Sequence, residues 1–132
     1  MWSYNQQVYP PAPFLDIAIL LPTGIARREE MRAKLDTGAD ISAIPTDVVV
    51  RLGLQPTRTI PVEGYDGVVT HLRTYVIALE MPVARFQRLE VIAVPENYAI
   101  LGRDVLNRFL TTLDGPNQAF TMEIPQEGKE EE

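Results

Sequence analysis

Residues 35–45 read LDTGADISAIP, and in this stretch an acid lies between an apolar residue and a glycine turn. We expect an apolar strand to end at Leu35, because Gly38 permits a tight turn directly after it. Asp36 would then be held partly buried in the turn, where the hydroxyl of Thr37 can brace it. A buried carboxylate is costly unless hydrogen bonds match its charge or it takes up a proton. By itself, however, D-T-G is a weak three-residue match that occurs in many surface turns, so this stretch alone favours an ordinary turn over a catalytic carboxylate.

The length and composition of the chain favour one globular domain. The chain has 132 residues, of which 45% are hydrophobic, enough to fill a single compact core. Its net charge of −6 argues against a nucleic-acid partner, because phosphate recognition needs clustered Lys and Arg. The chain has no cysteine, which excludes disulfides, thiolate metal sites and a cysteine nucleophile.

Proline and charge set the two ends apart from the middle of the chain. Residues 1–13 contain three prolines, so we expect an extended N-terminal arm that is either loose or packed on a partner chain. Residues 125–132, PQEGKEEE, have the composition of an acidic disordered tail, which leaves 14–124 as the domain. No run approaches the ~20 apolar residues of a membrane helix, and the N-terminus lacks a secretory pattern. We therefore expect a cytoplasmic protein with no membrane partner.

The middle of the chain is dominated by short runs rich in strand formers and broken by Gly, Pro and Asp. These runs predict strands over 14–21, 27–35, 68–81 and 86–94. In the second run, a period of two places Glu29, Met31, Ala33 and Leu35 on one face. Near the end, DGPN (114–117) lies between two further runs and predicts a hairpin. The pattern predicts an all-β fold.

Only two segments have a helical pattern, and both are short. In PTDVVVRLGL (45–54), we expect Thr46 to be the N-cap and Gly53 to end the helix in a left-handed conformation. In GRDVLNRFL (102–110), three apolar residues fall at helical spacing: Val105, Leu106 and Phe109.

Two ordered motifs and a possible flap make the signal more specific than D-T-G alone. LDTGADISAIP is followed far downstream by AILGRDVL (99–106), an apolar pair, Gly and Arg before a helix. Together they resemble the retropepsin family, the single-domain aspartic proteases of retroviruses and their cellular relatives. The first signature of the family is matched by 35–39 with Asp40 after it, and the second by Ile100, Leu101, Gly102 and Arg103. The resemblance covers roughly residues 14–124. It implies a closed retropepsin-like β-barrel or sandwich with a flap hairpin and one or two short helices.

The resemblance also implies a flap over the active site. The stretch VEGYDGVVTHLRTYVIALEM (62–81) fills the place of the family's flap hairpin, and the implied flap residues are Tyr65, Asp66, Gly67, Val68 and Val69. Retroviral flap tips are rich in glycine, whereas here Gly64 and Gly67 bracket two larger residues, which predicts a stiffer or differently shaped tip. The DGPN hairpin is more similar to the cellular and retrotransposon relatives than to the viral enzymes.

One carboxylate cannot hold both protonation states that peptide hydrolysis by carboxylates needs. The chain has one D-T/S-G, so a two-fold homodimer would supply the second acid, Asp36 from each chain. The resemblance implies that Thr37 and Gly38 support the active-site loop. It further implies that Ala39, Asp40 and Ile41 border a groove for an extended peptide, and that an ion pair joins Asp40 to Arg103.

Other chemistries have weaker support in the sequence. Ser42 has no histidine or other base nearby in the sequence, and His71, the one histidine, lies in a strand pattern as a solvent-facing residue. Asp36 and Asp40 do not continue into a calcium loop, so we expect no metal and no cofactor. Two functions remain open. The first is a homodimeric aspartic endopeptidase that cleaves peptides or proteins, and the alternative is a catalytically silent retropepsin-like module for peptide binding or dimerisation.

Overall fold

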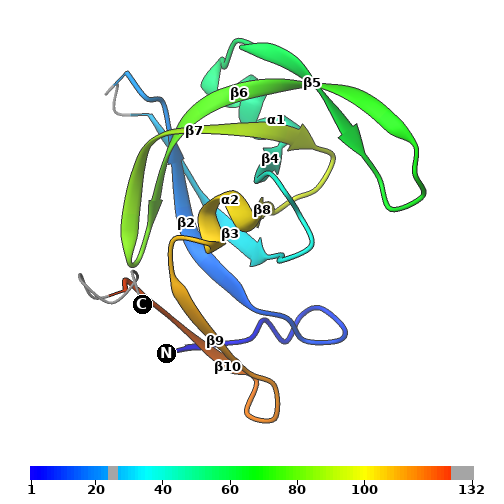
Figure 1. Ribbon diagram of the computed structural model, residues 1–132. Coiled ribbons are helices and arrows are strands. Elements are labelled where there is room, and N and C mark those ends of the chain that lie inside the picture. The colour runs from blue at the N-terminus through cyan, green and yellow to red at the C-terminus, as the bar shows by residue number, and fades with distance from the viewer. Residues whose placement is uncertain (24–26, 126–132) are drawn as a thin grey trace.

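A computed structural model describes residues 1–23 and 27–125 of the chain (Figure 1). Strands make up most of the described elements, which confirms the predicted all-β class. In chain order the elements are β1 (Trp2–Ser3), β2 (Phe14–Leu20), β3 (Arg28–Leu35), β4 (Ala43–Pro45), α1 (Thr46–Leu52), β5 (Arg58–Glu63), β6 (Val69–Met81), β7 (Ala84–Val94), β8 (Ala99–Leu101), α2 (Arg103–Leu106), β9 (Leu110–Asp114) and β10 (Ala119–Glu123). None of the helices in the described residues is long and apolar enough to cross a membrane.

Six of these strands form a closed barrel. The larger sheet has the order β2-β3-β8-β4-β7-β6-β5, and a further pairing of β2 with β6 closes the first six strands of this order into a ring. The strand β5 therefore remains outside the ring, attached to β6 alone within the described residues. The hairpin of β5 and β6 projects from the barrel at the upper right of Figure 1. Closure leaves the barrel with few free edges, which protects the ring against pairing with other chains.

The barrel interior follows from the alternation of the strands. Ala33 and Leu35 of β3 are buried, whereas Arg28, Glu30 and Arg32, which precede them at alternate positions, are exposed. Leu15 and Ile19 of β2 are almost completely buried in the same core, which also takes in side chains from both helices and from β10. Burial of each such aliphatic side chain contributes about 1.5–3 kcal/mol. The alternating pattern thereby determines which face of β3 looks inward.

The two predicted helices are present, but their ends differ from the prediction. In α1 the N-cap is Pro45 and not Thr46, because the chain is still in the extended backbone of β4 at Pro45 and becomes helical at Thr46. Gly53 ends α1 in the left-handed conformation, with φ of 65°, as predicted. The second helix is one turn, Arg103–Leu106, and does not continue to residue 110, because Leu110 already pairs in β9.

A smaller sheet holds the described ends of the chain together. Its strand order is β1-β10-β9, and the predicted DGPN hairpin forms the turn between β9 and β10. Trp2 of β1 stacks beside Phe120 of β10, with ring centroids 5.5 Å apart. The N-terminal arm therefore packs on its own chain. The predicted acidic tail lies outside the described residues except for Pro125.

Candidate active site

Asp36 lies directly after β3, at the point where this strand and its parallel neighbour β8 both end. Leu35 is opposite Leu101 in the register of the two strands. The backbone N–H of Asp36 donates to the carbonyl oxygen of Leu101 over 3.0 Å, so the sheet pairing continues one residue into the loop. The position of the acid is thus determined by two core strands.

Backbone hydrogen bonds within the D-T-G turn orient the carboxylate of Asp36. The backbone N–H of Gly38 donates to Oδ1 of Asp36 over 2.9 Å, and the N–H of Ala39 donates to the carbonyl oxygen of Asp36 over 3.2 Å. A Cβ at position 38 would lie 3.2 Å from the same Oδ1, a close contact that glycine avoids. Asp36 is half-buried, whereas Thr37 and Gly38 are exposed. The turn therefore presents an oriented carboxylate near the surface of one chain.

Gly102 brings the second motif into contact with the first. The N–H of Arg103 donates to the carbonyl oxygen of Ala39 over 2.8 Å. A Cβ at Gly102 would lie only 2.8 Å from that oxygen and 3.0 Å from the carbonyl carbon of Ile41. Both atoms belong to the backbone, so only glycine permits this close approach. The two motifs that were matched separately in the sequence thus form one interlocked unit.

A link between buried Ser42 and Asp104 joins the same two segments, and no motif or periodicity predicted it. The Ser42 side chain donates to Oδ1 of Asp104 over 2.7 Å, and its backbone N–H donates to Oδ2 over 3.0 Å. The Ser42 hydroxyl oxygen also accepts from the backbone N–H of Gly102 over 2.9 Å. Asp104 accepts a third bond, from the N–H of Val105. Ser42 is therefore a structural residue, held by groups about 60 residues away.

Arg103 contacts the active-site loop from its outer side. Its Nη2 donates to the carboxylate of Asp40, which forms the ion pair that the resemblance implied, and its Nη1 donates to the carbonyl oxygen of Thr37 over 2.7 Å. The Asp40 side chain is 85% exposed, so the ion pair itself contributes about 0–1 kcal/mol. The bond to Thr37 is the more informative contact, because it ties the D-T-G turn directly to α2.

The implied flap residues lie at the tip of the β5–β6 hairpin. The turn is closed by the N–H of Gly64 donating to the carbonyl oxygen of Val68 and by the N–H of Val68 donating to Oδ1 of Asp66, each over 3.0 Å. Gly67 has φ of 82°, which favours glycine. The side chain of Tyr65 is fully exposed, and those of Val68 and Val69 are more than half exposed. Within residues 1–23 and 27–125, no hydrogen bond joins this tip to the D-T-G loop.

The three residues that the resemblance assigns to the substrate groove lie together in the loop between β3 and β4. Ala39 and Ile41 are half-buried, whereas Asp40 is exposed. In Figure 1 the tip of the β5–β6 hairpin extends to the right, beyond the barrel. The described residues contain no cluster of three or more His, Cys, Asp or Glu side chains that could hold a metal ion.

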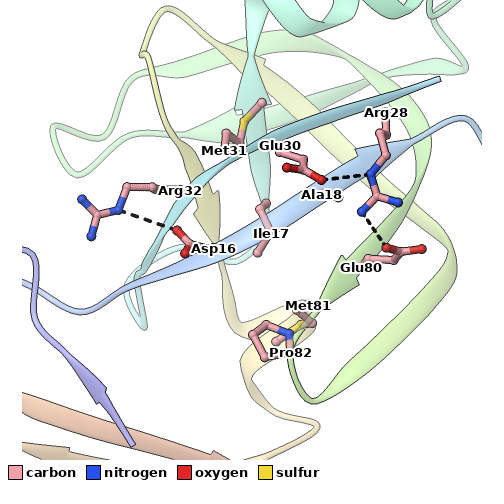
Figure 2. Close-up of a pocket in the computed structure, with 10 residues that line it drawn as sticks. All are labelled: Asp16, Ile17, Ala18, Arg28, Glu30, Met31, Arg32, Glu80, Met81 and Pro82. Carbon is pink, nitrogen blue, oxygen red and sulfur yellow. Dashed lines mark hydrogen bonds and ion pairs between the residues drawn. The ribbon is translucent and has the colours of Figure 1, made fainter.

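A separate hollow of about 500 Å³ lies on the surface of β2, β3 and the end of β6. Figure 2 shows its lining, in which Arg28 lies between Glu30 and Glu80 and Arg32 is paired with Asp16. Asp36 and the flap tip are not among the residues that line it.

Comparison with known proteins matches these features to one family. The family model described as "gag-polyprotein putative aspartyl protease" matches residues 22–108, which is more than half of the chain. The chain belongs to this family. The matched range contains both motifs, the loop between them and the β5–β6 hairpin. No curated protein matches the sequence.

Solved structures of aspartic proteases share the fold at low sequence identity. The solution structure of the Simian Foamy Virus (mac) protease has a TM-score of 0.53 and 20% identity, over 72% of this chain and 92% of the viral one. The EIAV protease, in complex with the inhibitor HBY-793, has a TM-score of 0.53 and 20% identity, over 75% and 88% of the two chains. A retropepsin-like aspartic protease from Rickettsia conorii has a TM-score of 0.60 and 13% identity, over 95% and 90%. These structures confirm the predicted retropepsin-like fold.

Proposed function

We propose that the protein is an aspartic endopeptidase that acts as a homodimer, with one Asp36 from each chain in a single active site. The observation that carries this proposal is the position of Asp36, which two core strands and two interlocked motifs hold near the surface of the chain. Membership of the aspartyl protease family supports the reaction type. A lone carboxylate cannot act as acid and base at once, so a second copy of the chain completes the site.

The reaction follows from two carboxyl groups that share one proton. Two carboxylates ~3 Å apart cannot both ionise, so one Asp36 is charged and the other is protonated. The ionised Asp36 removes a proton from water while the water oxygen bonds to the scissile carbonyl carbon. The protonated Asp36 of the second copy donates its proton to the carbonyl oxygen. When the tetrahedral intermediate collapses, the first Asp36 passes the proton that came from water to the leaving nitrogen and the C–N bond breaks. One hydroxyl of the intermediate returns its proton to the Asp36 of the second copy as the carbonyl re-forms, which restores the shared proton.

The loop and the flap supply the remaining parts of the site. Thr37 and Gly38 are exposed beside the acid, where a second copy can approach. The substrate is an extended peptide that lies along Ala39, Asp40 and Ile41 and presents side chains to alternate faces. The flap closes over it with Tyr65, Val68 and Val69, whose exposed apolar surface becomes buried against the peptide.

The test is cleavage of a mixed peptide library between pH 4 and pH 7 by the wild type, by Asp36→Asn and by Asp47→Asn. Asp47 is an exposed acid on α1 and serves as the matched control. We expect cleavage by the wild type and by Asp47→Asn, none by Asp36→Asn, and a dimer of each in sedimentation equilibrium. A protein that cleaves while it stays monomeric would contradict the shared dyad. A folded dimer that binds peptides without cutting them would establish the peptide-binding module instead.

A further inference from the structure

The β5–β6 hairpin leaves the barrel at Thr74. The strand β6 pairs with β5 over Val69–Thr74, but it pairs with β7 only from Thr74 onward. Beyond that residue the hairpin has the support of no other described strand. The direction in which the hairpin leaves the barrel therefore depends on how its base is fixed around Thr74.

Three side chains from three adjacent strands meet at this base. Arg58 of β5 donates to Glu90 of β7 through both Nε and Nη2, each over 2.7 Å, in a bidentate arrangement. Thr74 of β6 is completely buried, and its hydroxyl donates to Oε2 of the same carboxylate over 2.6 Å. Both oxygens of Glu90 are thus occupied. We call these three residues the flap clamp.

The geometry of the flap clamp restricts the orientation of β5 relative to β6 and β7. Arg58 is opposite Thr74 in the register, and Glu90 is opposite Val76, two residues further along β6, so the three side chains lie on one face of the sheet. Bidentate Arg–carboxylate pairs add geometric specificity to their energy, because two parallel bonds also set orientation. The clamp crosses β6 and joins β5 to a strand with which it does not pair.

We propose that Arg58, Thr74 and Glu90 are positioning residues that set the angle of the flap, and through it the closure of the flap over substrate. This inference rests on the proposed protease function. None of the three residues touches the reacting atoms, so their effect reaches catalysis only through the position of the flap tip.

The charge state of the clamp suits acidic conditions. Hydrogen bonds from the Arg58 guanidinium and then from the Thr74 hydroxyl lower the pKa of Glu90 from 4.5 to about 2. A glutamate with the ordinary pKa would lose its charge in the range where paired active-site aspartates titrate, which extends to about 4.7 in pepsin. The clamp therefore stays charged as the pH falls through the range in which an ordinary glutamate takes up a proton.

The test compares Glu90→Gln with Glu80→Gln in the full-length protein. Glu80 is a close control, because it also lies on the β6–β7 hairpin and pairs with two arginines, Arg28 and Arg85. Its side chain is 31% exposed, against 29% for Glu90. Its contacts are at the far end of β6, away from the flap.

The first measurement is amide hydrogen exchange of residues 59–73 at a temperature far below unfolding. Loss of a charged hydrogen-bond network is expected to accelerate this exchange by about tenfold in Glu90→Gln. Glu80→Gln should stay within about twofold of the wild type. Equal exchange in Glu90→Gln and the wild type, or the same acceleration in Glu80→Gln, would overturn the clamp. This measurement needs no activity, so it decides the clamp even if the protein cuts nothing.

The second measurement is the kinetics of a cleaved peptide. We expect Glu90→Gln to raise KM and lower kcat together, by about fivefold or more in kcat/KM, as for other residues that control lid position. The charge-exchanged double variant Arg58→Glu/Glu90→Arg should recover most of this loss. If the wild type cleaves and Glu90→Gln has unchanged kcat and KM, the proposed positioning role of the flap clamp is wrong, while the proposed protease function stands.

Discussion

Replacement of Ser42 by alanine would test the buried link between the two motifs. The Ser42 side chain is almost completely buried, at 2% exposure, and its hydroxyl serves two partners at once. It donates to the carboxylate of Asp104 and accepts from the N–H of Gly102. Alanine removes both bonds with little change in volume, so the effect reports the hydrogen bonds rather than the packing.

The expected magnitude follows from those two bonds. Loss of a hydrogen bond to a charged group costs about 1.5–3 kcal/mol, and a buried N–H left without an acceptor costs about 1–3 kcal/mol. Since alanine also avoids the cost of burying a hydroxyl, we expect a net loss of about 2–4 kcal/mol in the free energy of unfolding. In a domain of this size each kcal/mol lowers Tm by about 3–4 °C, which gives a fall of about 6–16 °C.

The assay is urea unfolding of the wild type, Ser42→Ala and Ser3→Ala, monitored by fluorescence. Thermal unfolding of the same three proteins then gives Tm. Ser3 is exposed and is the matched control, with an expected change within about 0.5 kcal/mol. A double-mutant cycle with Asp104→Asn should show that the losses of unfolding free energy are not additive, because both substitutions break the same hydrogen-bond network. If Ser42→Ala were as stable as Ser3→Ala, the link would not hold the two motifs together.

Three further predictions concern Gly102, Arg103 and Glu90. Gly102→Ala should lose about 1–3 kcal/mol of unfolding free energy, because its Cβ would meet backbone atoms, whereas Gly115→Ala has open space and should be nearly neutral in the same urea assay. Arg103→Ala removes the bond to Thr37, so peptide cleavage should fall by about tenfold or more while Tm changes little; an unchanged kcat/KM would contradict this role. The pKa of Glu90 is lowered on folding, from 4.5 to about 2, so its contribution to stability is full above pH 4.5 and is lost as the pH falls toward 2. The difference in unfolding free energy between wild type and Glu90→Gln should therefore narrow over that range. A constant difference would refute the role of the Glu90 charge in stability.

Local patterns predicted the parts of the structure that depend on neighbouring residues. Runs of strand formers located β2, β3 and β6, and the period of two predicted the inward face of β3. Gly53 located the end of α1, because a left-handed backbone is a property of a short segment. Helix ends were less accurate. The strand β4 continues to Pro45, and β9 begins at Leu110, so tertiary pairing decided both boundaries against the local pattern.

In the candidate site, too, residues within short motifs could be predicted, whereas contacts between distant segments could not. Asp36, Gly38 and the pair Asp40–Arg103 could be predicted as site residues because they lie in two recognisable motifs, and of these predictions the contact between Asp40 and Arg103 is present. The bond between Ser42 and Asp104 joins residues 62 positions apart, and that between Arg58 and Glu90 joins residues 32 positions apart. No periodicity connects such partners, since only the closed barrel brings them together. A motif can therefore identify the acid, but it does not show what holds the acid in place.

The closure of the barrel through β2 and β6, with β5 left outside, separates the chain into a fixed ring and an exchangeable part. Residues 64–68 can be lengthened, shortened or replaced by another tip without breaking any pairing of the ring, because the tip is held by bonds within its own turn. On the proposed protease function, variation there should alter which peptides are accepted and leave the free energy of unfolding nearly constant. The same function would make the chain a scaffold in which selectivity can be engineered by grafting, independently of thermal stability.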